Sequence, residues 1–314
     1  MLSKVPFEKR NFVKMLIEIC KEDNINIEKY GDSWFFRLSI NDMFRHIIGY
    51  RFELNSSAID IICGDKCATS DILCANHIPC IEHKFFLSFE NLNFINDNGT
   101  WGNIIEYFEK YNKVVCKPND GRGGKGVEIA NNRKELEKIV SNIFSKSRGL
   151  AMCPFYDINE EYRLILLNGK VELIFTKTRP TIIGNGKDTV LKLIIDSDNK
   201  FDIKSFDENM DYSYIPRENE KKVLTWKHNL ELGSSAIVVQ NQEKITQLTT
   251  IALKASKILN LKFASIDIVE IGNEYKILEI NSGVSMEYFS KCSNENYEKA
   301  KSIYKKAISL MFNL

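Results

Sequence analysis

Three side chains with hard oxygen ligands stand close together near the C-terminal end of the sequence. Asp267 lies in the stretch FASIDIVEI, and Glu279 and Asn281 lie in YKILEINSG. The Gly272-Asn273 turn between these apolar stretches predicts a strand hairpin, in which Asp267 and Glu279 can come opposite one another. Glu279 and Asn281 share one face because strand side chains alternate with period two. Carboxylate and amide oxygens suit Mg²⁺, and a merely solvated strand face is disfavoured because the flanking residues are those of a buried sheet.

A second candidate site is the loop KPNDGRGGKGVEIA, which begins at Lys117. Three of its glycines spell the dinucleotide pattern G-x-G-x-x-G, but that pattern requires a strand before it and a helix after it. Here apolar runs at 114–116 and 127–130 predict a strand on each side, and the lysine and hydroxyl of a P-loop are missing. The loop is therefore interpreted as a glycine-rich flap over phosphates, whose backbone N–H groups can approach oxygens. A solvated hairpin without a ligand is the alternative.

Apolar periodicity predicts the elements that must position these residues. Helices are expected at 8–21, from a cap at 55–57 toward 65–66, and at 68–75, 133–145, 246–259 and 296–311. Strands are expected at 34–40, 44–54, 161–167 and 170–178, with turns at Asn41-Asp42 and Asn168-Gly169. The polar stretch 196–219 predicts a mobile insertion.

Composition narrows the class of protein. The chain has 314 residues, enough for about two domains. Its 43 basic and 42 acidic residues give a net charge of +1, so nothing favours nucleic acid as a partner. The N-terminal stretch MLSKVPFEKRNFVKMLIEIC is charged where a signal peptide needs an apolar core, and the apolar runs are too short for a membrane span. We therefore expect a cytoplasmic protein without a membrane partner.

Four of the eight cysteines cluster in one short stretch, as Cys63, Cys67, Cys74 and Cys80. A metal site is one interpretation, but the spacings match no C-x₂-C zinc pattern. Because cysteine is often a small core residue, we expect this cluster to be structural.

Six segments in order resemble the ATP-grasp superfamily, most closely the ligase domains of glutathione synthetase and cyanophycin synthetase, with D-alanine–D-alanine ligase more distant. The segments are ELNSSAIDIICGDKCATSDIL, VVCKPNDGRGGKGV, EEYRLILLNGKV, RPTIIGNGKDTVLKLI, KHNLELGSSA and DIVEIGNEYKILEINSG. The resemblance implies an α+β fold in which two α+β subdomains grip ATP. It divides the chain into a shortened N-terminal region (1–75), a small lid subdomain (76–153) and a C-terminal subdomain with the metal site (154–314).

The resemblance also implies roles for single residues. The residues expected to bind ATP are Lys66 and Lys117 on the phosphates, Gly121, Gly123, Gly124 and Gly126 in the flap, and Glu161 on the ribose. The residues expected to hold two Mg²⁺ ions are Asp267, Glu279 and Asn281. The residues expected to act in catalysis are Arg179 and Arg163, which would stabilise charge on the transferred phosphoryl group. The residues expected to bind substrate are Asn229, Gly233 and Ser234. At Ser234 the family's second glycine is replaced by serine.

The reaction implied by the resemblance is ATP-dependent ligation of a carboxylate to an amine. The carboxylate attacks the γ-phosphate, and the amine then displaces phosphate from the acyl phosphate, leaving ADP. Amino acids or short peptides are the expected substrates, and a homo-oligomer is compatible with the sequence. Three alternatives stay open: a phosphotransferase without the amine step, a nucleotide-binding protein without activity, and a ligase that modifies a larger peptide.

Overall fold

The computed structural model describes residues 5–94, 100–121, 123–197, 201, 203, 206, 210–228, 230 and 235–314. Its N-terminal part is a helix packed on an antiparallel meander of four strands. The elements are the short 3-10 helix η2 (Phe7–Lys9), α1 (Asn11–Glu22), β1 (Asn26–Tyr30), β2 (Phe35–Ile40), β3 (Met43–Ile48) and β4 (Arg51–Phe52). The predicted inward face of the first helix is confirmed, with Phe12, Met15, Leu16 and Ile19 all buried.

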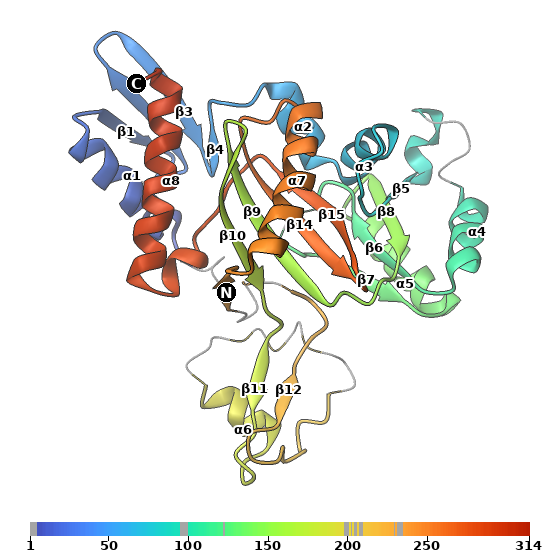
Figure 1. Ribbon diagram of the computed structural model, residues 1–314. Coiled ribbons are helices and arrows are strands. Elements are labelled where there is room, and N and C mark those ends of the chain that lie inside the picture. The colour runs from blue at the N-terminus through green and yellow to red at the C-terminus, as the bar shows by residue number, and fades with distance from the viewer. Residues whose placement is uncertain are drawn as a thin grey trace.

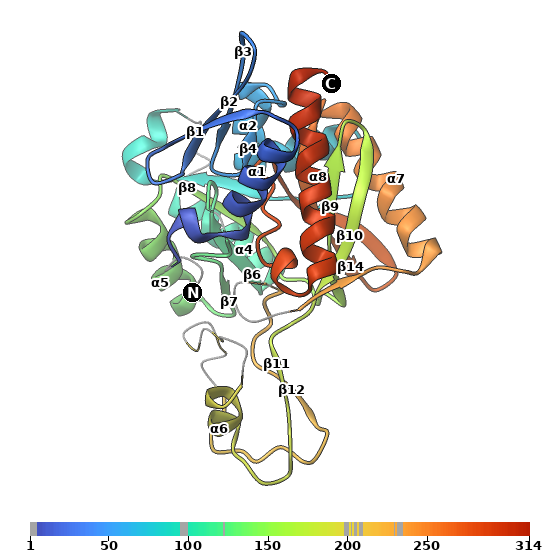
Figure 2. The same cartoon turned by 90° about the vertical axis from the view of Figure 1, so that its left-hand side faces the viewer.

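The C-terminal helix completes this N-terminal part. After the short η6 (Phe289–Lys291), α8 (Asn294–Phe312) lies beside α1 in both views of the molecule (Figures 1 and 2). Its Tyr304 packs against Phe12 and Phe52 in a shared aromatic core. The two ends of the sequence therefore stabilise one another through buried apolar surface.

Two capped helices lead from this part toward the rest of the molecule. α2 (Ser57–Gly64) begins where the Ser56 hydroxyl accepts a hydrogen bond from the Ile59 amide. α3 (Lys66–Ala75) begins where the Asp65 carboxylate accepts one from the Ala68 amide at 2.8 Å. Side-chain oxygens at these positions satisfy amides that the first helical turn leaves unpaired, so Lys66 is held in the first turn of a helix.

A second sheet has the strand order β5-β8-β6-β7, antiparallel throughout. Its strands are β5 (Lys84–Leu87), β6 (Val114–Pro118), β7 (Glu128–Ala130) and β8 (Gly149–Pro154). The helices between its strands are the short η3 (Phe89–Phe94), α4 (Trp101–Tyr111) and α5 (Arg133–Phe144). Because β6 and β7 pair directly, the glycine-rich loop joins strand to strand, as the sequence predicts.

The third sheet has the order β13-β10-β9-β14-β15 and one face covered by α7 (Figure 1). Its elements are β9 (Glu160–Leu167), β10 (Lys170–Lys177), β13 (Ala236–Val238), α7 (Gln242–Ile258), β14 (Phe263–Ile271) and β15 (Glu274–Asn281). Both predicted hairpins are confirmed, and Asp267 pairs with Glu279 across β14 and β15. The chain thus has the predicted mixed α and β architecture.

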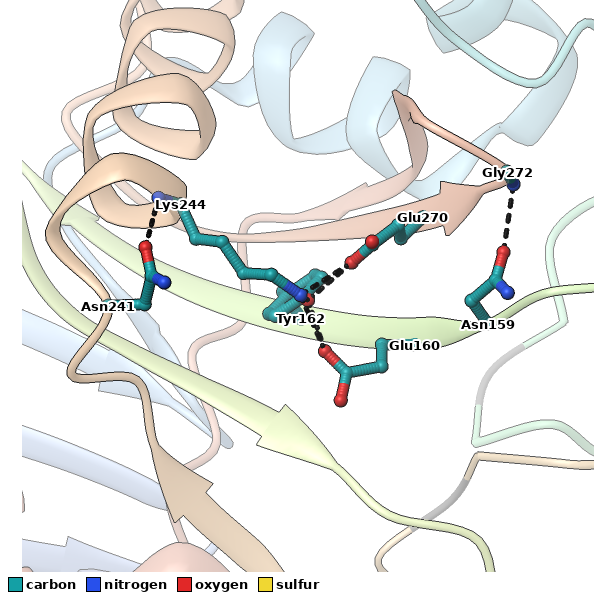
Figure 3. A network of polar contacts seen from close by, with 7 residues as sticks. All are labelled: Asn159, Glu160, Tyr162, Asn241, Lys244, Glu270 and Gly272. Carbon is teal, nitrogen blue, oxygen red and sulfur yellow. Dashed lines mark hydrogen bonds and ion pairs between the residues drawn. The ribbon is translucent and has the colours of Figure 1, made fainter.

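A polar network fastens α7 to this sheet (Figure 3). Lys244 of α7 donates to the Tyr162 hydroxyl at 2.7 Å and to Glu270 at 2.9 Å, and it also contacts Glu160. Since side chains alternate along a strand, β9 turns Glu160 and Tyr162 toward α7. The same alternation turns Glu161 and Arg163 to the opposite face.

A small arm projects from the third sheet (Figure 1). It contains β11 (Thr181–Ile183), α6 (Val190–Ile195) and β12 (Lys221–Val223). Part of the stretch 196–219, predicted to be a mobile insertion, lies outside the described residues. The described part supplies Phe201 and Phe206 to an apolar core with α6. Across the chain, none of the helices described is both long and apolar enough to span a membrane.

Candidate nucleotide and metal site

A cleft of about 610 Å³ opens where the second and third sheets face the N-terminal part. Ten of the predicted site residues line it: Lys66, Lys117, Gly121, Gly123, Gly124, Glu161, Arg163, Asp267, Glu279 and Asn281. These residues come from a helix start, a hairpin loop and four different strands. Gly126 and Arg179 are not part of the cleft lining. Asn229, Gly233 and Ser234 lie outside the described residues.

The floor of the cleft is a cluster of two buried carboxylates, a buried lysine and a half-buried arginine. Arg163 donates to both oxygens of Asp267 at 2.7 Å, and Lys177 donates to the same carboxylate at 2.9 Å. Lys177 also forms an ion pair with Glu161. The sheet places all four groups on one face, because Arg163 pairs with Asp267 in register and lies two residues from Glu161.

Burial and charge act in opposite directions on the two carboxyl groups. Burial disfavours the charged form of Asp267, but Arg163 and Lys177 outweigh it and hold its pKa below the ordinary value. For Glu161, burial dominates and raises the pKa, although Lys177 opposes the shift. Asp267 is thus an anion held by two cations, and Glu161 depends on Lys177 to remain charged.

Glu279 and Asn281 lie at the end of β15, beside this cluster. The Asn281 amide donates to Glu279 at 3.0 Å, so both side chains point to the same place, as predicted. Their carboxylate and carbonyl oxygens fit a magnesium ion. Asp267 has the right chemistry as well, but both of its oxygens already accept hydrogen bonds from cations. In the described chain no three His, Cys, Asp or Glu side chains form a metal-holding group.

The glycine-rich loop lies against Lys66. The Lys66 ammonium donates to the carbonyls of Asn119 and Gly121, at 3.2 and 2.5 Å. Burial lowers the pKa of Lys66, and the negative charge of Glu279 opposes that shift. Three glycines of the loop have φ between 66° and 69°, a conformation that side chains with a Cβ rarely adopt: Gly123, Gly124 and Gly126. The loop shape therefore depends on glycine itself.

Lys117 lines the cleft from the end of strand β6 and is only 6% exposed. Within the described residues its ammonium makes no hydrogen bond or ion pair, in contrast to Lys177. A buried cation without a carboxylate partner is costly, so this position favours an anionic ligand.

Arg179 does not line the cleft, but it contacts His228, which does. Its Nε donates to His228 Nε2 at 2.9 Å, and its Nη2 donates to the Ile158 carbonyl. Since an arginine nitrogen only donates, His228 Nε2 must accept, and its protonated Nδ1 donates to the Lys177 carbonyl at 2.8 Å. Burial lowers the pKa of His228, which favours this neutral form.

Sequence reasoning missed Lys177 and His228 as cleft residues. Lys177 is the inward-facing lysine of the apolar strand VELIFTK, a position where a buried charge needs a partner. That signal was present in the sequence. His228 gave no comparable signal, because its contacts come from segments about 50 residues away.

Comparisons with known proteins point to one family. Residues 218–304 match the family of the RimK-like ATP-grasp domain. A cyanophycin synthetase from a Nostoc species is 30% identical over 137 residues, covering 43% of this chain and 14% of the relative. The bifunctional glutathione biosynthesis protein of Listeria monocytogenes is 23% identical over 202 residues, covering 55% of this chain and 26% of the relative. The chain thus spans only a fraction of the length of these relatives.

Solved structures agree at the level of the fold. A bifunctional glutathione synthetase from Pasteurella multocida superposes with a TM-score of 0.57 and 15% identity, over 91% of this chain and 42% of that chain. A D-alanine–D-alanine ligase from Bacillus anthracis gives 0.53 and 16%, over 83% and 72%. The predicted resemblance is confirmed: residues 218–304 match a RimK-like ATP-grasp domain, and the chain has the fold seen in these ligase structures.

Proposed function

We propose that this protein is an ATP- and Mg²⁺-dependent ligase that joins a carboxylate to an amine and releases ADP and phosphate. The observation that carries the proposal is the cleft itself. One wall offers two lysines and a glycine-rich loop, and the facing floor offers carboxylates and an amide oxygen. Cations facing hard oxygen ligands fit a triphosphate with its metal. By their names, the relatives given above are a cyanophycin synthetase and a bifunctional protein of glutathione biosynthesis.

The phosphates would lie between Lys66, Lys117 and the backbone amides of the loop. Opposite charge attracts the triphosphate, and binding would replace the carbonyl contacts that Lys66 now makes. Glu161 would bind the ribose hydroxyls. We propose that the lid (76–153) closes the loop over the C-terminal subdomain (154–314), which would exclude the water that hydrolyses an acyl phosphate.

Glu279, Asn281 and Asp267 would hold Mg²⁺. An ion held by these residues would supply positive charge to the phosphate oxygens. Asp267 would then share its oxygens with Arg163 and Lys177, which keeps these two cations aimed at the transferred group. Arg163 is thus proposed to stabilise the transition state from the cleft floor, where its two hydrogen bonds to Asp267 hold it in place.

The carboxylate substrate would bind at the N-terminal end of the cleft. Arg10, Tyr50 and Arg51 line that end, and Arg10 donates to the Tyr50 hydroxyl at 3.0 Å. In the described chain Arg51 makes no ion pair or side-chain hydrogen bond, so its guanidinium is available to a carboxylate. We propose amino acids or short peptides as substrates, with Asn229, Gly233 and Ser234 on the acceptor side.

Product analysis tests this function. The protein is incubated with ATP, Mg²⁺ and a panel of amino-acid and dipeptide pairs, and ADP release is compared with the mass of the organic product. We expect ADP and an amide in equal amounts, with no AMP. AMP and pyrophosphate as products would refute the acyl-phosphate route. ADP with a stable phosphorylated product would instead identify a phosphotransferase.

Arg179→Ala should separate binding from chemistry. Arg179 is not part of the lining of the cleft, so ATP affinity should stay within a few fold. We propose that its guanidinium stabilises charge on the transferred phosphoryl group once the lid has closed, so turnover should fall roughly 10²- to 10³-fold. Lysine at position 179 should rescue poorly, since the two donor contacts to His228 and Ile158 need two nitrogens.

Lys117→Ala is the matched comparison, and it should weaken nucleotide binding as well as turnover. Calorimetry of ATP binding and assays of ADP release measure both effects. If Arg179→Ala loses ATP binding as severely as Lys117→Ala, Arg179 belongs to the nucleotide site.

The glycine-rich loop should become ordered when nucleotide binds. Glycine loses more conformational freedom on ordering than other residues, so contacts to phosphate are needed to fix residues 119–126. Hydrogen exchange of this loop should therefore slow on addition of Mg²⁺ and a non-hydrolysable ATP analogue. Equal exchange with and without the analogue would mean that the loop is a rigid turn.

A further inference from the structure

Two cysteine thiols outside the cleft machinery lie next to one another. Cys74 is in the last turn of α3, Cys80 follows that helix, and their sulfurs are 3.2 Å apart. A disulfide needs about 2.05 Å, so a small movement of the side chains joins them. Of the four cysteines that the sequence predicts to be structural, Cys63 and Cys67 are buried, whereas Cys80 is half-buried and Cys74 is exposed.

The backbone between the two cysteines already holds them together. The amides of His77 and Ile78 donate to the carbonyls of Cys74 and Leu73, at 3.0 and 2.9 Å, and close the end of the helix. His77 has φ of 56°, the left-handed conformation typical of a helix end. The chain therefore returns toward the helix at Cys80, and no unfolding is needed for the sulfurs to meet.

The second cysteine is also fixed to the sheet. Cys80 forms an isolated bridge with Ile277 of β15, and the Ile81 amide donates to the Ile277 carbonyl at 2.8 Å. Ile277 lies two residues before Glu279 on the same strand, and α3 begins with Lys66. A bond between Cys74 and Cys80 would thus connect the helix that carries Lys66 to the strand that carries Glu279.

We propose that Cys74 and Cys80 form a redox-active dithiol, which small disulfides oxidise to an intramolecular disulfide that fixes the end of α3 onto β15. The thiolate of exposed Cys74 attacks the small disulfide, giving a mixed disulfide and one free small thiol. The Cys80 thiolate then attacks the Cys74 sulfur and displaces the second small thiol. The protein loses two electrons and two protons, and one small disulfide is reduced to two thiols.

Cys292 and the buried cysteines serve as internal comparisons. Cys292 is exposed like Cys74, but no second cysteine sulfur contacts it in the described chain. Burial raises the pKa of Cys80 to about 12, with the Cys74 contact adding to it, so Cys80 reacts slowly unless a mixed disulfide is placed beside it.

Peptide mapping of the whole protein tests the proposal. Reduced protein is incubated with about 0.1 mM each of oxidised and reduced glutathione, quenched with acid and digested. Because a neighbouring thiol acts at millimolar effective concentration, the Cys74–Cys80 crosslink should exceed the glutathione adduct on Cys74 about tenfold. Cys292 should stop at the adduct. Cys74 stopping at the adduct, or both cysteines staying reduced while Cys292 reacts, would overturn the proposal.

Single serine variants assign the two steps. Cys80→Ser should leave Cys74 as a glutathione adduct, like Cys292, and Cys74→Ser should leave Cys80 reduced. In the wild type, hydrogen exchange of residues 73–81 should be slower after oxidation than before it. A crosslink without this slowing would refute the fixing of α3 to β15. None of these measurements depends on the proposed ligase activity.

Discussion

Glu279→Gln should lower turnover at least about 100-fold and leave the fold intact. Loss of groups that only support a metal ligand costs 10- to 100-fold, so loss of the anionic ligand itself should cost no less. Gln keeps the size and one carbonyl oxygen, and the Asn281 amide can still donate to it. The effect should therefore come from the missing charge. It should shrink at high Mg²⁺ concentration, which partly offsets weaker metal binding.

Glu274→Gln is the matched control for this variant. Glu274 lies on the same strand, β15, at its exposed end, where it contacts Lys276 across the surface. Removing that charge should leave turnover close to the wild-type value, since exposed ion pairs contribute little. Mg²⁺ titrations of ADP release, with thermal unfolding to verify the fold, measure both variants. Near-normal turnover of folded Glu279→Gln would remove Glu279 from the metal site.

Lys177→Met should destabilise the protein by about 3–5 kcal/mol, the usual cost of removing one partner from a buried ion pair. Lys177 is 5% exposed and contacts two carboxylates, which are themselves buried. Arg163 still neutralises Asp267 in the variant, so the main loss falls on Glu161. Methionine fills most of the volume, which keeps the cavity cost small. Denaturant unfolding measures the difference.

The pH dependence of this loss identifies its cause. Without Lys177, the pKa of buried Glu161 in the folded protein stays above its unfolded value of 4.5. The folded state then binds more protons than the unfolded state, so stability falls as pH rises above 4.5 toward the folded pKa. The loss of stability caused by Lys177→Met, relative to the wild type, should therefore be smaller at pH 5 than at pH 8.

Adding Glu161→Gln to Lys177→Met should remove that pH dependence and recover part of the stability. A loss that is equal at both pH values would show that packing, and not the unpaired Glu161, accounts for it.

The sequence by itself determined the parts of the site that neighbours along the chain control. The hairpin turn at Gly272-Asn273 brings Asp267 within one residue of the position opposite Glu279, and a bulge between Asp267 and Ile268, which no sequence pattern indicates, completes the pairing. Alternation with period two aligns Glu279 with Asn281, and paired strands on both sides of the glycines make that loop a hairpin. These relations are local, so residue type and spacing are enough to predict them.

Only the tertiary structure decided which side chains meet across the cleft. Lys177 neutralises Glu161 and Asp267, which are 16 and 90 residues away, because β10, β9 and β14 are neighbours in one sheet. Arg179 is predicted from its sequence segment to face the reacting group, yet it contacts His228 and does not line the cleft. Likewise α8 closes the core of α1, from the opposite end of the chain. Such contacts depend on strand order and helix packing, which bring together residues that no local pattern relates.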